Sequence, residues 1–424
     1  MSAADLVNPE DLIYPKNYGV AGQPHEAWTT LRREAPIFRV ETELYPPFYA
    51  ITRHEDITEI SSRPLVFSNA DGINLLTRQQ VAESAKTEAN PLGNMRTIIS
   101  MDPPEHREFR KIASGFFTRR SIHRLDAVVE ECARAHVDKL GEEGECDFVE
   151  VIAERHPLRV LGNILGIDEA DEELLLRLTQ ELLAGDDPDL QREGEDRQQA
   201  IRELGMEFMG LFNRVLEDRR AHPQDDLATI IAHATMEDGT PMGLIETLGY
   251  YLIVFTAGHD TTRNAISGGM AAFLDHPEQL ARLGRDPSLA KSAIEEVVRW
   301  TSPVNYMRRR LLQDVEMRGV KMREGDDVVM FYASANRDDD VFDRPFEFDI
   351  TRQPNRHLGF GTGEHFCLGA HVARLSSRAL FQELSSRLDH VEAANGRKFI
   401  ESSLVVGQKT LPIRYRMKRA AQPI

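Results

Sequence analysis

The stretch Phe360-Gly-Thr-Gly-Glu-His-Phe-Cys-Leu-Gly369 carries more chemistry per residue than any other part of the sequence. Gly361 and Gly363 permit a tight turn with positive φ. The apolar pattern of residues 368–375 predicts the first turns of a helix. We therefore expect Cys367 at a helix N-terminus, where unpaired amides and the positive end of the helix dipole stabilise a thiolate. The alternative is that Cys367 is a small core residue beside a glycine turn.

A thiolate at this position is a natural axial ligand for haem iron. The complete pattern Phe-Gly-x-Gly-x-His-x-Cys-x-Gly resembles the haem-binding signature of the cytochrome P450 family. The resemblance implies that Cys367 binds the iron of haem b (iron protoporphyrin IX), with Phe360 and Gly369 as further cofactor-binding residues. His365 stands where many members of the family carry Arg.

A long helix is predicted upstream, because no proline lies between Pro241 and Pro277. Its centre, Ala257-Gly-His-Asp-Thr-Thr262, contains residues that lower helix stability. This segment is similar to the oxygen-activation motif of the same family. The similarity implies that Ala257 and Gly258 border the haem, that Thr261 binds the oxygen species, and that Asp260 relays protons. The role of His259 stays open, and a helix kink stabilised by Thr-to-carbonyl bonds is the alternative.

A charged pair follows on the next predicted helix. Glu296 and Arg299 are three residues apart and share one helical face. Arg352 follows after a strand-rich stretch and shortly before the cysteine loop. The family resemblance implies that these three residues form a buried structural triad that supports the fold rather than the chemistry.

Two prolines in Asp102-Pro-Pro-Glu-His106 predict the start of another helix, with His106 and Arg110 one turn apart. The resemblance implies that both bind haem propionates, together with Arg309 and His365. Charge-assisted bonds from Arg or His to a carboxylate are the physical reason. Arg309 lies within Arg308-Arg-Arg310, so the propionate-binding residue could be its neighbour.

The fold class expected from these patterns is mainly α with small β-sheet regions, a cytochrome P450 fold. Residues 1–424 form a single domain, with the haem between the long helix and the cysteine loop and with flexible ends at about 1–14 and 417–424. Helical periodicity extends from about Ser100 to Thr301. Runs with strand character are Phe48–Thr52, Val328–Tyr332, Leu404–Val406 and Ile413–Tyr415.

Composition excludes several classes of protein. The formal charge of -18 disfavours nucleic acid and anionic membrane surfaces as partners. No apolar run approaches the roughly 20 residues of a membrane span, and Met1–Glu10 lacks the apolar core of a signal peptide. The three cysteines form neither a disulfide framework nor a zinc pattern, so we expect a cytoplasmic protein without a membrane anchor.

The resemblance implies a monooxygenase that cleaves O2 and inserts one oxygen atom into a C–H bond. Only two cysteines remain beside Cys367, too few for an iron–sulfur cluster within the chain. A separate ferredoxin and ferredoxin reductase are therefore implied as electron donors. Candidate residues for docking an acidic ferredoxin, with ordinary surface solubility as the alternative, are Arg107, Arg110, Lys111, Arg374 and Arg378.

The substrate is expected to be small and apolar, because few fixed charges occur in the segments that line the pocket in this family. Phe67–Ala70, Gly144–Phe148 and the His259-containing motif resemble bacterial terpene hydroxylases of the α-terpineol type, which favours a terpenoid. A steroid or fatty acid is the alternative substrate, and a non-catalytic haem-binding sensor or carrier is the alternative from another class. Asp260-Thr261 disfavours a peroxide-driven enzyme. Expected pocket residues, besides the loop 72–99 in general, are Ile98, Val304, Asn305, Val405 and Val406.

Overall fold

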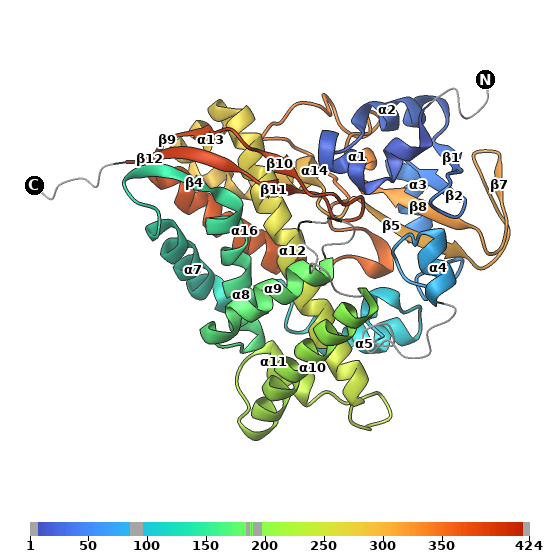
Figure 1. The fold of residues 1–424 in the computed structure, drawn as a ribbon, viewed down its shortest axis with the longest axis horizontal. Coiled ribbons are helices and arrows are strands. Elements are labelled where there is room, and N and C mark those ends of the chain that lie inside the picture. Colours follow the sequence, from blue (N-terminus) through green and yellow to red (C-terminus); the bar gives the residue numbers. More distant parts are fainter. Residues whose placement is uncertain (1–6, 85–95, 184–186, 188, 190–196, 419–424) are drawn as a thin grey trace, which may run out of the picture.

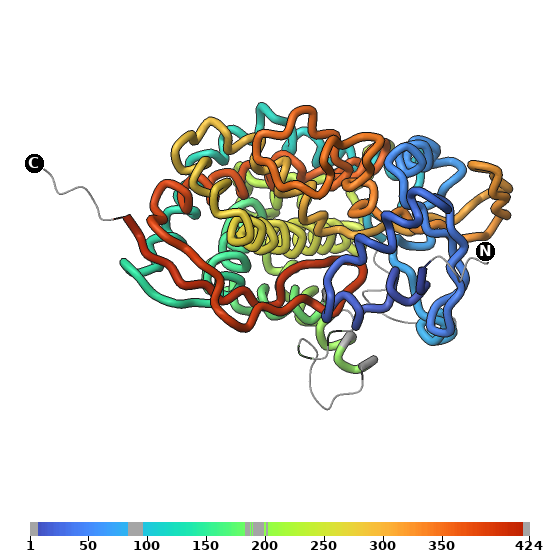
Figure 2. Tube along the Cα trace, turned by 90° about the horizontal axis from the view of Figure 1, so that it is seen from above, coloured from blue at the N-terminus to red at the C-terminus, as the bar shows by residue number. Residues whose placement is uncertain are grey.

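The structure is a computed structural model that describes residues 7–84, 96–183, 187, 189 and 197–418. It is 54% helical with small sheets in a single domain, which confirms the predicted fold class. Its central element is α12 (Leu244–Asp275), a helix of 32 residues that runs through the middle of the molecule, as Figures 1 and 2 show. The predicted long helix is therefore confirmed.

Helices form most of the body in Figure 1. Before α12 the chain forms α1 (Pro15–Ala21), α2 (His25–Glu34), α3 (His54–Ser61), α4 (Arg78–Ser84), α5 (Glu105–Ser114), α6 (Arg119–Ile122), α7 (Asp126–Asp138), α8 (Arg155–Leu165), α9 (Glu172–Leu183), α10 (Arg197–Ala221) and α11 (Leu227–Ala232). After α12 it forms α13 (Pro277–Arg285), α14 (Ala290–Thr301), α15 (Tyr332–Ala335) and α16 (Ala370–Arg387).

Among the residues that the structure describes, the strands form four small sheets. The largest has the order β1-β2-β8-β5-β3 and lies with the N-terminal helices on one side of Figure 1. Its strands are β1 (Ile37–Val40), β2 (Phe48–Ile51), β8 (Asp327–Phe331), β5 (Tyr306–Leu311) and β3 (Phe67–Ser68). The others pair β4 (Glu143–Asp147), β12 (Pro412–Met417) and β9 (Leu388–Ala393); β10 (Lys398–Phe399) and β11 (Gln408–Thr410); and β6 (Val315–Met317) and β7 (Val320–Met322).

Close helix packing around α12 depends on glycines within it. A Cβ at Gly258 would lie 2.9 Å from Leu161 of α8, and a Cβ at Gly269 would lie 2.8 Å from Val297 of α14. Both distances are shorter than ordinary van der Waals contact. Gly258 therefore lets α8 approach the segment that was expected to be functional, and Gly269 lets α14 approach α12 about two turns further along.

Three local predictions were wrong. Residues 404–406 are not a strand: Val405 forms only an isolated bridge with Val304, because this segment pairs with a turn rather than with another strand. Tyr332 begins α15 instead of ending a strand. Residues 143–147, within the stretch expected to be helical, form β4, because they pair in register with the distant strand β12.

Residues within both ends that were expected to be flexible make defined contacts. Residues 9–12 form a short 3₁₀ helix, and Leu12 and Ile13 are fully buried. The Tyr18 hydroxyl donates a hydrogen bond of 2.7 Å to the Leu12 carbonyl. At the other end, the Lys418 amide donates to the Arg387 carbonyl at 2.7 Å. Only residues 1–6 and 419–424 of the ends expected to be flexible lie outside the described residues.

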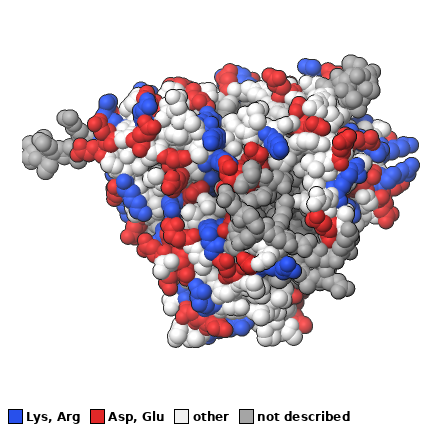
Figure 3. Space-filling view, in the orientation of Figure 1, with Lys and Arg blue, Asp and Glu red and all other residues white. Residues whose placement is uncertain are grey.

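The surface fits the composition. On the face seen in Figure 3, acidic and basic side chains are interspersed, and the described residues form no broad basic surface there. Within the described ranges, no helix is both long enough and apolar enough to cross a membrane.

Candidate functional site

The cysteine loop folds as its glycines suggest. Gly361 and Gly363 have φ of 68° and 72°, and a Cβ at Gly363 would also collide with the Ser61 carbonyl at 2.4 Å. The Cys367 amide donates to the Phe360 carbonyl at 2.9 Å, which closes the loop. Helix α16 begins at Ala370 with Gly369 as its N-cap. Cys367 thus lies immediately before a helix N-terminus.

The Cys367 side chain is accessible, yet the protein around it opposes ionisation. Burial of the surrounding site raises the pKa of the thiol, and the Gly369 amide, Arg110 and Arg374 offset only part of that rise. A bound metal ion deprotonates a ligating thiol outright. The loop therefore provides partial support for a thiolate and leaves the rest to a metal.

Phe360 is held by a charged cluster that the sequence did not reveal. The guanidinium carbon of Arg374 lies 4.3 Å from the Phe360 ring centre. Glu295 accepts two bonds from Arg374, at 2.6 and 2.9 Å, and lies 3.0 Å from Nε2 of His357. Burial alone would raise the pKa of Glu295, but His357 and Arg374 lower it to about 2. The one sequence signal for Glu295 is its position directly before Glu296.

Part of the long helix is accessible in spite of its central position. Ala257 is exposed, although its neighbours Thr256 and His259 are buried. The Thr261 hydroxyl donates to the Ala257 carbonyl at 2.7 Å, the Thr-to-carbonyl bond named above as an alternative. Because this bond uses the hydroxyl hydrogen, the Thr261 oxygen remains able to accept a hydrogen bond.

Asp260 belongs to a buried network. Its Oδ2 accepts from Nδ2 of Asn264 at 3.1 Å, and its Oδ1 lies 3.8 Å from Nη1 of Arg263. Burial raises the pKa of Asp260, and Arg263 counteracts part of that rise. A carboxyl with a raised pKa is suited to proton transfer near neutral pH.

The role of His259, left open by the sequence, is settled by its contacts. Its Nε2 donates to the Glu154 carbonyl at 3.0 Å, and its ring lies parallel to that of Phe255. Burial lowers its pKa to about 4, so the ring is neutral at neutral pH. His259 is therefore a contact between α12 and the start of α8.

The residues expected at the haem propionates come together. The rings of His106 and His365 lie 4.0 Å apart between centres. Nδ1 of His106 and Nε2 of His365 are buried without a hydrogen-bond partner among the described residues. Burial and the charges of His106 and Arg309 lower the pKa of His365 to about 3. Arg110 donates to the Phe366 carbonyl at 2.5 Å and borders the same group.

The alternation of strand β5 resolves which arginine faces this group. Arg308 and Arg310 both contact Oδ1 of Asp327, at 2.9 and 3.1 Å. Arg309, between them, is buried. It donates to the Arg308 carbonyl at 2.8 Å and to the Tyr332 hydroxyl, with no carboxylate within ion-pair distance in the described part of the chain. Successive side chains of a strand point to opposite faces, so Arg309 points away from Asp327.

These residues fit an iron porphyrin. Cys367 offers a soft sulfur donor. His365 and Arg309 offer donors for carboxylates, and no carboxylate of the described residues pairs with them; Nδ1 of His106 has only the Glu364 carboxylate, at 3.6 Å. An iron porphyrin with two propionates supplies a metal for the Cys367 sulfur and carboxylates for these donors. Ordinary core packing of Cys367 supplies neither.

The structural triad has the expected contacts. Glu296 accepts two bonds of 2.7 Å from Arg299 and two of 3.2 Å from Arg352. The Asp349 amide also donates to Glu296, at 2.9 Å. Glu296 and Arg299 are fully buried.

The expected pocket residues divide into two groups. Ile98, Val304 and Val405 are only partly buried, and the bridge between Val304 and Val405 brings the last two together. Asn305 is fully buried and donates to the Tyr18 hydroxyl at 3.1 Å and the Ser403 carbonyl at 2.8 Å, so it holds the fold. Val406 is buried in the N-terminal core. Residues 85–95 of the expected pocket loop lie outside the described residues.

Most basic residues considered for ferredoxin docking have acidic partners. Arg107 contacts Glu364 at 2.7 Å, Lys111 contacts Glu237 at 3.5 Å, and Arg374 contacts Glu295 as described above. Arg107 and Lys111 are nevertheless largely exposed, with side-chain exposures of 67% and 77%. An incoming acidic surface would compete with these weak surface pairs.

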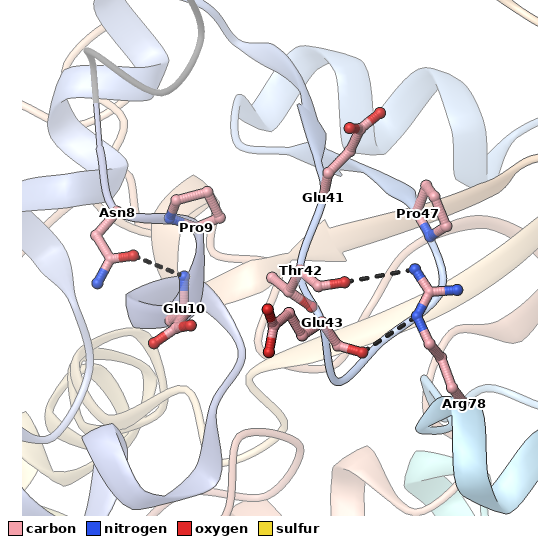
Figure 4. Close-up of a pocket in the computed structure, with 8 residues that line it drawn as sticks. All are labelled: Asn8, Pro9, Glu10, Glu41, Thr42, Glu43, Pro47 and Arg78. Atoms are coloured by element: carbon pink, nitrogen blue, oxygen red, sulfur yellow. Dashed lines mark hydrogen bonds between the residues drawn. The ribbon is translucent and has the colours of Figure 1, made fainter.

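Two cavities lie elsewhere. One, of about 480 Å³, is bordered by Glu10, Glu41, Glu43 and Arg78; Figure 4 shows Arg78 donating to the carbonyls of Thr42 and Glu43. The other, of about 380 Å³, lies between α8 and the end of α10. Neither contains a residue of the predicted site.

Comparison with known proteins shows similarity along nearly the whole chain. A family model described as Cytochrome P450 matches residues 287–416. Cytochrome P450-terp of a Pseudomonas species is 37% identical over 412 residues, 95% of this chain and 96% of that protein. A methyl-branched lipid omega-hydroxylase of Mycobacterium tuberculosis is 37% identical over 398 residues, 91% and 90% of the two chains. Linalool 8-monooxygenase of Pseudomonas putida is 32% identical over 416 residues, 97% and 99% of the two chains.

Solved structures agree. The crystal structure of CYP108D1 from Novosphingobium aromaticivorans superposes with a TM-score of 0.87 at 33% identity, covering 97% of this chain and 98% of that one. A Mycobacterium marinum cytochrome P450 in complex with pseudoionone gives 0.84 at 34% identity, covering 93% and 95%. The similarity therefore includes both the N-terminal sheet and the cysteine loop.

Proposed function

Because this chain belongs to the cytochrome P450 family and is one of its monooxygenases, we propose that it hydroxylates a small apolar terpenoid at a haem b held by Cys367. The cofactor assignment rests on one observation. The site combines the accessible Cys367 thiol with buried hydrogen-bond donors that lack protein acceptors. The family itself implies a haem-thiolate iron cofactor, O2 as co-substrate and a bound organic substrate.

The roles of the loop and its neighbours follow from their contacts. Cys367 binds the iron, and Phe360 and Gly369 shape the loop around it. His106, Arg110, Arg309 and His365 bind the propionates. When bound, the haem supplies O2 binding and O–O cleavage, which thiolate donation favours. Glu296, Arg299 and Arg352 hold the polypeptide that carries the loop.

The residues proposed to transfer protons lie on the long helix α12. Asp260 takes up a proton from water on its carboxyl and passes it on through water to the site beside Thr261. The Thr261 oxygen accepts a hydrogen bond there, because its own hydrogen is donated to Ala257. Ala257 has a small side chain and Gly258 has none, so these residues leave space beside this face of α12. A non-catalytic sensor or carrier would not require the acid beside the hydroxyl.

A terpenoid is the favoured substrate because two relatives carry terpenoid names, P450-terp and linalool 8-monooxygenase. The partly buried apolar side chains of Ile98, Val304 and Val405 suit such a molecule. A branched lipid, fatty acid or steroid is the second candidate, because the methyl-branched lipid omega-hydroxylase has the same sequence identity to this chain, 37%, as P450-terp.

Electrons are proposed to come from a separate ferredoxin and its reductase, in the cytoplasm. Cys132 and Cys146 are the only cysteines besides Cys367. No group of three or more metal-ligating side chains of His, Cys, Asp or Glu occurs among the described residues. Exposed Arg107 and Lys111 are candidate docking residues.

Two measurements test this proposal. The carbon monoxide difference spectrum of the reduced protein should show the red-shifted Soret band of a thiolate ligand, and Cys367→Ser should lose it while the control Cys132→Ser keeps it. Its absence in the wild type would refute the haem-thiolate assignment. Spin-state titration with monoterpenoids, branched fatty acids and steroids should give the tightest binding for a monoterpenoid; tighter binding of a lipid would replace the terpenoid assignment.

A further inference from the structure

Arg263 lies between two carboxylates and pairs closely with only one of them. Its Nη2 and Nε contact Oε1 of Glu154 at 2.9 and 3.0 Å. Its Nη1 donates to Oδ1 of Asn264 at 2.9 Å and stays 3.8 Å from Oδ1 of Asp260. Side-chain exposure is 6% for Arg263, 8% for Glu154 and 14% for Asp260. The guanidinium therefore faces Glu154, although Asp260 is on its own helix one turn away.

Glu154 is itself fixed on both sides. It stands at the junction between the π-helical turn Val149–Ala153 and α8, and its carbonyl accepts from His259 of α12. Leu161 of α8 also packs closely against Gly258, which is adjacent to His259 in α12, so α8 is held against α12 near this hydrogen bond. Glu154 cannot follow Arg263 toward Asp260 without breaking these contacts.

The remaining neighbours of Asp260 are few. Asn264 donates to Asp260 and accepts from Arg263, so the orientation of its amide is fixed. A Cβ at Gly407 would lie 2.2 Å from Oδ1 of Asn264, so the C-terminal loop also holds this amide in place. The charged groups that act on Asp260 are Arg263 from its own helix and Glu154 from the η5–α8 junction; His259 is neutral.

We propose that Glu154 is a positioning residue that holds Arg263 away from Asp260 and thereby leaves the Asp260 carboxyl free to take up and release a proton. The proposal rests on the proposed proton-carrying role of Asp260. A close ion pair with Arg263 would keep Asp260 ionised and fixed in place. Glu154 prevents this by competing for the same guanidinium.

The sharpest test removes the charge of Glu154 in the holoenzyme. In Glu154→Gln, Arg263 loses its stronger partner and can close on Asp260. We expect product formation per electron pair to fall about tenfold at neutral pH, because the closer guanidinium lowers the pKa of Asp260 and leaves less of it protonated. The solvent isotope effect should rise, and the infrared signal of the protonated Asp260 carboxyl, identified by its loss in Asp260→Asn, should move to lower pH.

Companion variants separate positioning from simple structural damage. Glu154→Asp keeps the charge and should restore most of the coupling. Glu154→Gln combined with Arg263→Gln removes both the tether and the cation, and should recover coupling relative to Glu154→Gln alone. Glu172→Gln is the matched control, because Glu172 pairs with Arg159 of α8 at 2.9 Å without facing Asp260.

The outcomes are distinguishable. If Glu154→Gln leaves coupling, isotope effect and infrared signal unchanged while Asp260→Asn is impaired, the inference is wrong and the role of Asp260 stands. If Asp260→Asn keeps normal coupling, the proton-carrying role itself is wrong. If the double variant is as impaired as Glu154→Gln, or if Glu154→Gln does not fold while the double variant folds with poor coupling, Glu154 is structural only.

Discussion

Two sets of donor groups inside this molecule differ in whether the protein supplies their acceptors. Arg299 directs its donors to Glu296 and to the carbonyls of Asn336, Pro345 and Glu347. Arg309 is also buried but has no carboxylate within ion-pair distance among the described residues, and Nε2 of the partly buried, neutral His365 has no hydrogen-bond partner there. A buried charge without a partner destabilises a fold. The first group thus holds the polypeptide together, whereas the second keeps donors available for an anionic ligand.

The largest effect is expected from breaking the satisfied group. Glu296→Gln leaves Arg299 and Arg352 without a counter-charge and should lower the free energy of unfolding by about 3–5 kcal/mol. That is a large share of the roughly 5–15 kcal/mol that a folded domain has. Urea unfolding of the holoprotein measures it. A loss below about 1 kcal/mol would contradict the role of the triad as fold support.

Removing the cation Arg309 should affect haem binding rather than the stability of the polypeptide. Arg309→Met should not destabilise the haem-free protein, but should weaken haem binding about tenfold to a hundredfold, as expected for a charge-assisted bond of about 1.5–3 kcal/mol. Haem transfer to an excess of a competing haem protein measures the affinity. Arg310→Met is the control, because Arg310 pairs with Asp327 and should leave haem affinity unchanged. Equal haem loss in both variants would show that Arg309 has no special role.

Buried histidines show a third solution, in which the group stays neutral. His156 is fully buried, and burial lowers its pKa to about 3. Below the unfolded value of about 6.5 the unfolded chain binds a proton that the folded chain does not, so stability falls by about 1.4 kcal/mol per pH unit until the pH approaches the folded pKa. His156→Gln should reduce the slope of unfolding free energy against pH by this amount, and the exposed His390→Gln should not. An unchanged slope in His156→Gln would mean that His156 is not the group responsible.

The smallest effect is expected at the surface. Arg177 and Glu207 form an ion pair whose side chains are 44% and 36% exposed. Glu207→Gln should change the unfolding free energy by less than about 1 kcal/mol, because water screens both charges. Measured beside Glu296→Gln, it shows how much of the triad's effect comes from burial. Similar losses in the two variants would remove the distinction between paired groups inside and outside the core.

Much of the candidate site could be predicted because its motifs are local. The glycine spacing before Cys367, the destabilised centre of α12 and the Glu296/Arg299 pair each lie within a few residues. The sequence left open whether Arg309 or a neighbouring arginine binds a propionate. The alternation of side chains along β5 then distinguished Arg309 from Arg308 and Arg310.

What could not be predicted depends on contacts between distant segments. Glu154 and Arg263 are far apart in sequence, and nothing near either residue indicates the other. Residues 404–406 have strand composition, but they meet a turn rather than a strand edge. Asn305 was expected in the pocket, yet its amide is used by Tyr18 and Ser403, which lie near opposite ends of the chain.

The position of β12 has a consequence for how the protein is made. This strand, at residues 412–417, lies between β4 and β9 and pairs with both. Until the ribosome has released residues 412–417, β4 and β9 lack this neighbour and their edges remain open. The chain therefore reaches its native fold only after β12 has been made, and a chain that stops before residue 412 leaves two unpaired edges available for association with other chains.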